Sequence, residues 1–393
     1  MSFKFAHMSD CHLGSWSSHP EMREKPLEAF DKAIDMCISE RVDFVIIAGD
    51  LLDTSLPGVD VLKSAAAIFR RCKDEGIPIY IVAGSHDYSP TGKTMLSVFE
   101  NAGLVVDVAK YEDGEKIKLE FTTDKKTGVK IAGLFGKKGS LEVGMFERLE
   151  VPDEKGSKIF VFHCGIDEHI SMKGMSSVPV SLLPKGFDYY ATGHIHIKRV
   201  YDIDGKKIAF PGPLFPTSFD ELEHYDSGFY IVEGGNIERK TVKLFDVLLI
   251  EEDATDRSPG DVEGSLMDKI ENNLANTLVL LKVHGVLKSG KPSDINFKAV
   301  AARAESLGAI TVKKNINKLL SPSMEEIAVD AASMDNIERR IVEEHAEKMK
   351  LGNDTTSLIM SLMNVLKDEK GEDETNATFE EKIKGNAKKL LGL

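Results

Sequence analysis

Short apolar runs alternate with segments of helical periodicity along the first part of the chain. Four runs are rich in β-branched and aromatic side chains, and each predicts a buried strand: 3–8, 42–48, 77–83 and 104–108. Apolar residues recur at the spacing of one helix face in three segments between them: 28–39, 59–71 and 94–101. Strands and helices that alternate in this way indicate a layered α/β domain.

From residue 116 to residue 135 the pattern changes to shorter β segments. Further strands are predicted at 158–162, 187–191, 200–203, 206–210 and 228–232. Asp204 and Gly205 separate two of these strands and are typical of a hairpin turn. We therefore expect an α/β fold with four layers, in which two sheets are flanked by helices.

A second alternation of strands and helices begins near residue 244. Strands are predicted at 247–250, 277–283 and 309–313, with helices at 260–274 and 297–307. Beyond Ser321 the chain becomes polar, and amphipathic helices are predicted at 335–350, 354–366 and 379–391. We expect three domains, 1–243, 244–320 and 321–393. The tail helices either pack on their own protein or bind a groove or coiled coil of a partner.

Composition and charge narrow the class of protein. With 393 residues, 42% of them hydrophobic and 29% charged, the chain is typical of a globular protein of two or three domains. No apolar run reaches the roughly 18 residues of a membrane span, and four scattered cysteines suit a reducing compartment, so we expect a cytoplasmic protein. The net charge of −14 argues against a simple nucleic-acid binder. Local basic loops, bound cations or a second subunit would have to bind a nucleic acid.

Acids and histidines follow the apolar runs in five places. The residues at these strand ends are Asp10 and His12, Asp50 and Asp53, His86 and Asp87, His163, and His194 and His196. An α/β sheet places its ligands beyond the carboxyl ends of its strands, so we expect these side chains to converge. Mixed nitrogen and oxygen ligands suit Mn, Fe or Zn, and a carboxylate such as Asp50 can bridge two ions.

The order of these motifs resembles the calcineurin-like metallophosphoesterase superfamily. The motifs are Asp-x-His, Gly-Asp-x-x-Asp, Gly-Ser-His-Asp, His and Gly-His-x-His. Within the superfamily, residues 1–243 resemble the meiotic-recombination-eleven nucleases of DNA double-strand-break repair, of archaeal type, and their bacterial SbcD-type relatives. The segments that carry this closer resemblance are 5–14, 19–24, 189–196 and 228–233.

The resemblance implies a manganese-dependent exonuclease and endonuclease that works on duplex ends and hairpins. One ion would be held by Asp10, His12, Asp50 and His196, and the other by Asp50, Ser85, His163 and His194. His86 would act on the scissile phosphate or the leaving oxygen, Asp87 would stand behind it, and Asp53 matches an acid that superfamily members keep. Candidate DNA contacts are Trp16, His19, Arg23, Lys198 and Arg199, for which an ordinary loop aromatic and solvated charges are the alternatives.

The resemblance also implies partners. The family works as a homodimer, and residues 244–320 resemble its capping domain, which shapes the access of duplex DNA. A coiled-coil ATPase of the Rad-fifty type would bind the helices within 335–391.

The chain departs from the family pattern at Ser85, where the family has asparagine. A serine hydroxyl lies closer to the backbone than an asparagine amide oxygen, so we expect a weaker second ion site and reduced nuclease activity. A natural variant and an engineered inactivating substitution would both give this residue. Two other hypotheses follow: a small-molecule phosphodiesterase or phosphatase of the same superfamily, and a weakly catalytic scaffold that bridges DNA ends.

Overall fold

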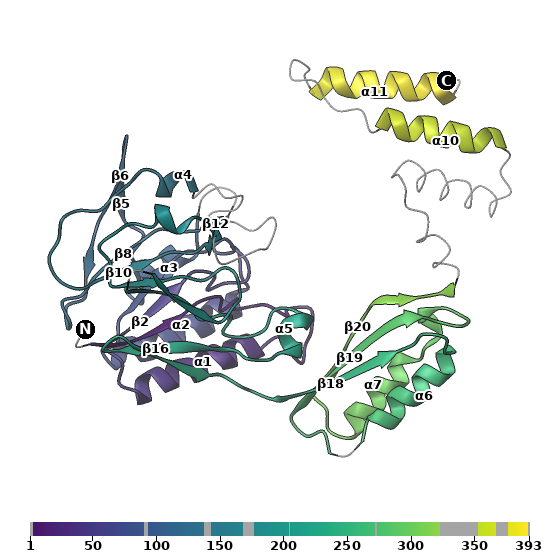
Figure 1. Ribbon diagram of the computed structural model, residues 1–393, viewed down its shortest axis with the longest axis horizontal. Helices are drawn as coiled ribbons and strands as arrows, with labels where there is room; N and C mark the ends of the chain where they lie inside the picture. Colours follow the sequence, from purple (N-terminus) through teal and green to yellow (C-terminus); the bar gives the residue numbers. More distant parts are fainter. Residues whose placement is uncertain are drawn as a thin grey trace. The chain divides into compact units, whose positions relative to one another are not determined.

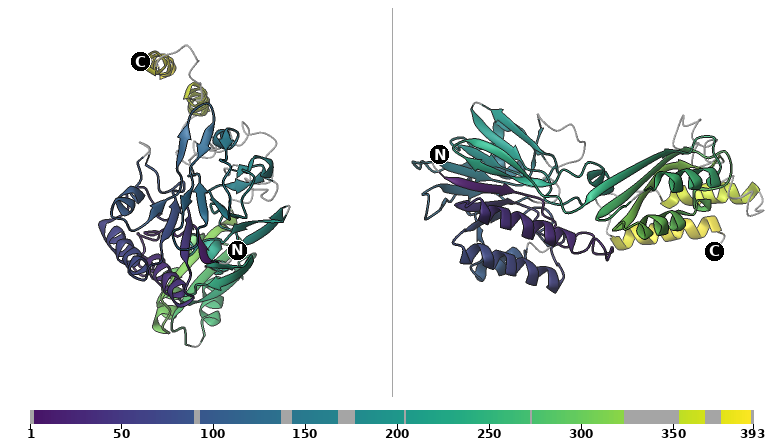
Figure 2. Two further views of the ribbon diagram at one scale, coloured as in Figure 1. Left: turned by 90° about the vertical axis from the view of Figure 1, so that its left-hand side faces the viewer. Right: turned by 90° about the horizontal axis from the view of Figure 1, so that it is seen from below.

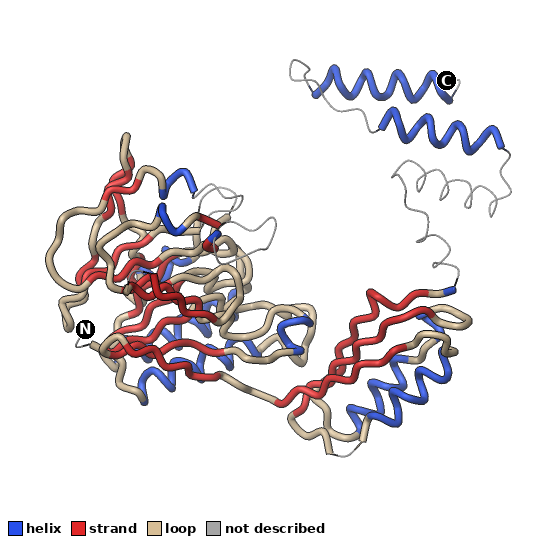
Figure 3. Tube along the Cα trace, in the orientation of Figure 1, coloured by secondary structure: helices blue, strands red, loops and turns tan. Residues whose placement is uncertain are grey.

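The computed structural model describes residues 3–89, 93–136, 143–167, 177–203, 205–271, 273–322, 353–366 and 376–391. The N-terminal part is built on two six-stranded sheets (Figures 1 and 3). In spatial order the first sheet contains β17 (Asn236–Thr241), β16 (Gly228–Glu233), β1 (Lys4–Met8), β2 (Phe44–Ala48), β3 (Ile79–Val82) and β4 (Val106–Asp107). The second contains β14 (Arg199–Ile203), β15 (Lys206–Phe210), β13 (Tyr189–Ala191), β10 (Lys158–Val161), β8 (Lys130–Gly133) and β7 (Thr122–Thr123).

The strands that end in the predicted ligands run parallel to one another. In the first sheet β1 pairs with β2, and β2 with β3, in parallel. In the second sheet β10 pairs in parallel with β8 and with β13. β4 and β15 extend these parallel sets. Antiparallel pairs are added at the sides by β16 and β17 in the first sheet and by β14 and β7 in the second. The carboxyl ends within each sheet therefore lie along one edge.

The alternation of side chains explains why two sheets form layers. On β1 and β2, Phe5 and Phe44 face the second sheet, where their rings stack 5.1 Å apart and Phe5 contacts Tyr189. The neighbouring residues, such as Val45, point to the opposite face and pack against helices. Both faces of these strands are buried, which is why they read as continuous apolar runs.

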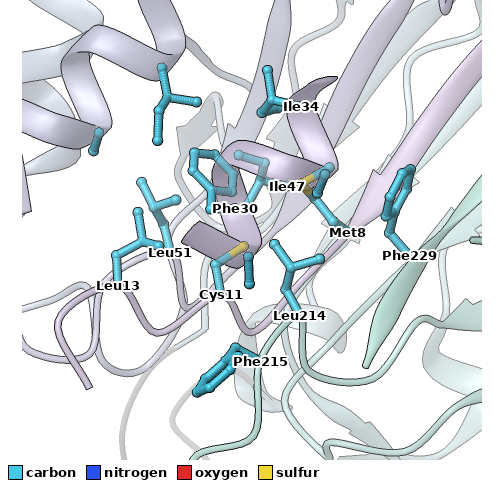
Figure 4. Packing of buried hydrophobic residues seen from close by; sticks show 14 of the residues in the cluster. Met8, Cys11, Leu13, Phe30, Ile34, Ile47, Leu51, Leu214, Phe215 and Phe229 are labelled. Carbon is cyan, nitrogen blue, oxygen red and sulfur yellow. The ribbon is translucent and has the colours of Figure 1, made fainter. Parts of the chain in front are cut away.

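Helices cover the outer face of the first sheet. They are α1 (Lys25–Ser39), α2 (Val59–Asp74) and α3 (Leu96–Asn101). Phe30 and Ile34 on α1 pack with Met8 and Ile47 from the sheet (Figure 4). Leu214 and Phe215, which follow the second sheet in the chain, close the same core near Cys11. The predicted helices of this part are confirmed.

The outer face of the second sheet is covered by short elements. They are α4 (Val143–Phe146), a 3-10 helix (Val180–Leu182) and short strands: β5 (Tyr111–Asp113), β6 (Ile117–Leu119), β9 (Leu149–Glu150), β11 (Gly165–Ile166) and β12 (Ser177–Val178). Phe146 and Phe162 meet edge to face in this core. The expected fold of two sheets with outer layers is confirmed. In this layer the helices are short, α4 and a 3-10 helix, and short strands cover the rest of the face.

A third sheet contains β18 (Asp246–Asp253), β19 (Thr277–Val286) and β20 (Thr311–Leu320). Between its strands the chain forms α6 (Pro259–Lys269) and α7 (Phe297–Ser306), which lie alongside the sheet (Figures 1 and 2). This is the predicted order of strands and helices, although the strands are longer and α6 is shorter than we expected. A second 3-10 helix (Pro292–Asp294) precedes α7.

By its contacts the chain forms two compact units. One comprises Met1–Glu251, Asp268–Lys282 and Lys298–Asn315, and the other comprises Glu252–Met267, Val283–Phe297 and Ile316–Leu393. The strands β18, β19 and β20 each have residues in both units, so the domain boundaries near 244 and 321 stay a prediction.

Two tail helices, α10 (Asn353–Leu366) and α11 (Asn376–Leu391), match the predicted helices and contact each other. The predicted helix at 335–350 lies outside the described residues. Within the described parts of the chain, none of the helices has both the length and the apolar character of a bilayer span.

Candidate metal centre

The ends of five strands bring acids and imidazoles together. Asp10 follows β1, Asp50 follows β2 and His86 follows β3 in the first sheet, while His163 follows β10 and His194 and His196 follow β13 in the second. The candidate ligand atoms form three groups, in each of which they lie within 4.8 Å of one another: Asp10, His12 and His196; His12, Asp50 and His86; and Asp50, His163 and His194. His12 belongs to the first and second groups and Asp50 to the second and third, so the three groups adjoin one another. The bridging role of Asp50 stays a prediction.

The backbone at these residues is unusual. Five of the candidate ligands have positive φ angles: Asp10 (51°), His12 (43°), Asp50 (49°), His194 (84°) and His196 (49°). Such angles are uncommon outside glycine, and they concentrate at functional sites, where the surrounding structure must hold them. Hydrogen bonds between the loops supply that support, because the Asp10 N–H donates to the Gly49 carbonyl and the His12 N–H to the Asp50 carbonyl.

Two glycines allow the loops to approach one another. A Cβ atom at Gly84 would lie 2.3 Å from both the backbone nitrogen and Oδ1 of Asp50. A Cβ atom at Gly193 would lie 2.6 Å from Cβ of Ser9 and 2.8 Å from the Ala48 carbonyl oxygen. Any side chain at these positions would push the candidate ligands apart.

Hydrogen bonds at one ring nitrogen orient three of the histidines. Nδ1 of His163 lies 2.8 Å from the Ala48 carbonyl oxygen, and Nδ1 of His86 lies 2.7 Å from the Asp53 carbonyl oxygen. Since a carbonyl only accepts, these Nδ1 atoms carry the proton. Nδ1 of His196 lies 2.7 Å from Oε1 of Glu221. The Nε2 atoms are thereby left for the interior of the cluster.

The Nε2 atoms and the buried carboxylates face one another at short range. Nε2 of His163 lies 3.0 Å from Oδ2 of Asp50 and has no partner of good hydrogen-bond geometry among the described residues. Nε2 of His12 lies 3.1 Å from Nε2 of His196, which lies 3.6 Å from Oδ1 of Asp10. This set of buried acids and inward-facing imidazole nitrogens fits divalent ions, which mixed nitrogen and oxygen donors hold well.

The charges of the cluster shift its pKa values strongly. Burial opposes a charge on His163, but Asp50 and Asp10 outweigh it and raise the pKa of His163 to about 10. Against the same opposition from burial, Asp10 and Glu221 raise the pKa of His196 to about 9. Burial and the neighbouring His163 lower the pKa of His194 to about 4. Protons on His163 and His196 thus supply positive charge that a bound cation would replace.

Ser85 and Asp87 follow β3 and have different surroundings. Oγ of Ser85 lies 3.4 Å from Oδ2 of Asp50, so the short side chain ends beside the predicted bridging acid. The carboxylate of Asp87 is fully buried and accepts hydrogen bonds from the backbone N–H groups of Gly84, Leu52 and Leu51. Burial and the charge of Asp50 raise the pKa of Asp87 to about 7. Asp87 therefore ties the loop after β3 to the loop after β2.

Asp53 lies at the margin of the cluster. Its Oδ1 is 3.5 Å from Nδ1 of His12. Asp53 also lines a hollow of about 350 Å³ that extends along the loops after β1 and β2 to Ser17, Thr54 and Arg23. The cluster therefore has an open space beside it.

The candidate DNA contacts have partners within the protein. The indole N–H of Trp16 donates to the Pro216 carbonyl at 2.7 Å, and the ring lies 5.4 Å from the ring of His19. Arg23 pairs with Glu24, and Lys198 with Asp226. The guanidinium of Arg199 lies over the ring of Tyr201. Their role toward DNA stays a prediction.

Glu221 is a contributor that reasoning from the sequence missed. It lies on α5 (Phe219–Glu223), where Ser218 caps the first turn by accepting from the Glu221 N–H. A serine followed three residues later by glutamate is a readable helix-start signal, but it carries no sign that the acid reaches a histidine.

Comparisons with known proteins are consistent with this geometry. Residues 3–198 match the family model described as calcineurin-like phosphoesterase. The chain is similar to proteins named DNA double-strand break repair protein Mre11, being 31% identical to that of Saccharolobus solfataricus over 58% of this chain and 59% of that protein. It is 33% identical to the Sulfurisphaera tokodaii protein over 56% of each chain. It is 23% identical to the Archaeoglobus fulgidus protein over 98% of this chain and 86% of that protein. The chain thus spans less than two thirds of two of these relatives and most of the third.

Proposed function

Since residues 3–198 make this chain a member of the calcineurin-like phosphoesterase family, we propose that it is a manganese-dependent DNA nuclease, the nuclease subunit of a double-strand-break repair complex. One observation carries the proposal: acids and imidazoles from five strand ends form three adjoining groups, joined through His12 and Asp50. The similarity to the repair protein of Archaeoglobus fulgidus, over 98% of this chain, supports the choice of DNA as the substrate. The enzyme would cleave phosphodiester bonds at duplex ends and in hairpins.

Two divalent ions would supply the central chemistry when bound, by binding the scissile phosphate and activating a water molecule. The residues that would hold one ion are Asp10, His12, Asp50 and His196, and those for the other are Asp50, Ser85, His163 and His194. Manganese suits this mixed donor set better than magnesium, which prefers oxygen ligands and water.

The protein's own groups would position and move protons. His86 donates its Nδ1 proton to the Asp53 carbonyl, and its ring lies 4.8 Å from that of His12. When the ring is the imidazolium, Nε2 also carries a proton and would give it to the leaving oxygen, the role that we assign to His86. Asp87 fixes the loop that carries His86 through three backbone hydrogen bonds. The carboxylate of Asp53 lies beside Nδ1 of His12, and its carbonyl oxygen accepts the hydrogen bond from His86.

We propose that Ser85 attenuates this activity. Its hydroxyl lies against Asp50, 3.4 Å from Oδ2, instead of extending past the carboxylate as an asparagine amide would. The second ion would then have one protein ligand fewer than the first. Since the two ions share the work on the phosphate, weaker occupancy of one lowers turnover.

A nuclease assay on defined DNA ends tests the function. Cleavage of blunt duplexes and hairpins is expected with Mn²⁺, with little or none in chelator. The substitution Asp50→Asn, which removes the bridging charge, should reduce cleavage at least about a hundredfold. Cleavage in chelator, or an Asp50→Asn variant as active as the parent, would refute the proposal.

The same assay separates the rival functions. Faster turnover of a chromogenic phosphodiester than of duplex DNA would favour a small-molecule phosphodiesterase. Binding of DNA ends in manganese without cleavage would favour a scaffold that bridges ends. The predicted capping and tail segments support the nuclease, because a minimal phosphatase needs neither.

We further propose two protein partners. A coiled-coil ATPase of the Rad-fifty type would bind the tail within 335–391, where α10 carries Leu358, Ile359, Leu362 and Met363 at the spacing of one helix face. A second copy of the chain would cover exposed apolar side chains of the nuclease part, among them Leu56, Val59 and Val98. Work on chromosomal DNA would place the complex at the nucleoid in the cytoplasm.

A further inference from the structure

Among the described residues, His196 is the candidate ligand whose outer nitrogen forms a hydrogen bond with a carboxylate, since Nδ1 of His12 lies 3.5 Å from Oδ1 of Asp53 without hydrogen-bond geometry. Its Nδ1 lies 2.7 Å from Oε1 of Glu221, whereas the corresponding atoms of His163 and His86 meet backbone carbonyls. A carboxylate partner fixes the tautomer and the ring direction, and it also makes the opposite nitrogen a stronger donor. His196 therefore depends on a side chain that substitution can remove.

Glu221 is itself held rigidly. Its second oxygen, Oε2, accepts from the backbone N–H of Thr217 at 2.7 Å and from the Thr217 hydroxyl at 3.2 Å. Its own N–H donates to the hydroxyl of Ser218, the residue that caps α5. Thr217 thus holds Oε2, and Oε1 is the oxygen that meets His196.

The direction matters because the opposite nitrogen faces the cluster. Nε2 of His196 lies 3.1 Å from Nε2 of His12 and 3.6 Å from Oδ1 of Asp10. These residues form the group that would hold one ion, and Glu221 contacts none of them except His196. Neither His163 nor His194 has a hydrogen bond to Glu221.

We propose that Glu221 is a positioning residue for one of the two ions, acting only through His196. It turns Nε2 of His196 toward Asp10 and His12 and adds negative charge behind the imidazole. The ion held by Asp10, His12, Asp50 and His196 depends on Glu221, and the ion held by Asp50, His163 and His194 does not. This inference rests on the proposed function for the presence of two ions, but it makes no use of DNA cleavage.

Calorimetric titration of the full chain with Mn²⁺ alone tests the proposal. Glu221→Ala should weaken the binding of one ion about 10- to 100-fold and leave the other unchanged, since outer partners of metal ligands have effects of this size. Glu221→Gln keeps an oxygen for the Nδ1 proton but loses the charge, so it should fall between Glu221→Ala and the parent. Asp220→Asn removes one charge from the same helix at an exposed position and should bind as the parent does.

A double-substitution cycle shows whether Glu221 acts through His196. When His196→Ala is already present, adding Glu221→Ala should change the remaining Mn²⁺ affinity by less than twofold. When His194→Ala is present instead, Glu221→Ala should keep its full effect. Thermal unfolding in chelator identifies any variant that has lost its fold, and Glu221→Gln, which is nearly the same size as the parent side chain, then decides the result.

Three results would each overturn the proposal: parent affinity in Glu221→Ala, an equal loss in Asp220→Asn, or an undiminished effect of Glu221→Ala when His196 is absent. The test is separate from that of the proposed function. If the chain binds Mn²⁺ as expected but cleaves no DNA, the nuclease assignment fails and the role of Glu221 stands.

Discussion

At the scale of the residue, the candidate centre is a set of side chains held in costly backbone conformations. Left-handed backbone costs a residue other than glycine on the order of 1–3 kcal/mol, and five candidate ligands adopt it. Asp and His tolerate this region better than β-branched residues do. Asp and His therefore suit the positions after the apolar runs for two reasons: they can bind metal, and they tolerate the backbone conformation of these turns.

The raised pKa values predict that metal binding releases protons. His163 and His196 have pKa values of about 10 and 9 in the absence of metal, above the ordinary value of 6.5, so both are protonated at pH 7. A cation at Nε2 replaces these protons, so Mn²⁺ affinity should rise with pH up to about 9 and level off near 10. Calorimetry in two buffers of different ionisation enthalpy measures the release, and identical heats in the two buffers would contradict it.

The same pKa values fix the sign of the stability change in the metal-free protein. A group whose pKa is raised on folding stabilises the fold below its unfolded pKa, here about 6.5, and this contribution is lost as pH rises through the folded value. The protein in chelator should therefore unfold at progressively lower temperature from about pH 6.5 to pH 10. A midpoint that stays constant or rises across this range would show that the carboxylates do not hold these protons.

A third prediction at this scale concerns Ser85. Ser85→Asn should tighten the weaker Mn²⁺ site about tenfold or more and raise nuclease turnover, because it restores a neutral oxygen beyond Asp50. Ser85→Ala is the matched control: if the hydroxyl does not reach the ion, this variant should bind Mn²⁺ as the parent does. Equal affinity in the parent and Ser85→Asn would end the idea that Ser85 attenuates the site.

At the scale of the element, the fold works by ending several strands at one edge. The sequence predicted most of these strands, because those buried on both faces read as unbroken apolar runs, as in Phe44–Ala48. It did not predict β17 (Asn236–Thr241), a mostly polar strand at the side of the first sheet that depends on pairing with β16. Edge strands of this kind owe their structure to a neighbour and have little pattern of their own.

The residues of the candidate centre, like the strands, were predictable from the sequence only in part. The inner acids and histidines stand at strand ends and could be read directly, whereas Glu221 comes from a helix whose approach to His196 is set by tertiary structure. Trp16 illustrates the same difficulty, since nothing in its sequence context indicates the hydrogen bond to Pro216. Partners far apart in the chain are visible only when the fold is known.

Substitutions at two glycines test how closely the loops at the strand ends must approach one another. Gly84→Ala would place a methyl group 2.3 Å from the backbone and side chain of Asp50, so it should destabilise the protein by at least about 2 kcal/mol and weaken Mn²⁺ binding. Gly264→Ala, on an exposed face of α6 with no atom within 4 Å, should instead stabilise by about 0.5–1 kcal/mol. Urea unfolding with and without Mn²⁺ measures both, and a neutral Gly84→Ala would show that the loops are not closely packed.

At the scale of the whole molecule, the candidate metal centre and the helices proposed to bind the ATPase come from different parts of the chain. The candidate ligands all lie before residue 200, and the amphipathic tail helices lie after residue 350. Because the net charge is −14, bound cations and local basic loops would have to contact the phosphate backbone of the proposed DNA substrate. Removal of metal should therefore weaken DNA binding as well as cleavage.

Deletion of residues 322–393 tests the separation. The shortened chain should lose binding to the ATPase partner and keep the Mn²⁺ affinity of the parent, because none of the candidate ligands lies in the deleted segment. In the full chain, the double substitution Leu358→Asp and Leu362→Asp should also abolish ATPase binding by charging one face of α10. Co-purification with the ATPase measures both, and retained binding would refute the placement of the partner on the tail.

The position of β1 has a consequence for biosynthesis. This strand leaves the ribosome long before β16, yet it lies in the interior of its sheet, with β2 on one side and β16 on the other. Until Gly228–Glu233 has been translated, one row of its backbone donors and acceptors stays open on the growing polypeptide, ready to join a foreign strand. Nascent chains that stall before this segment should be the ones that chaperone holdases retain.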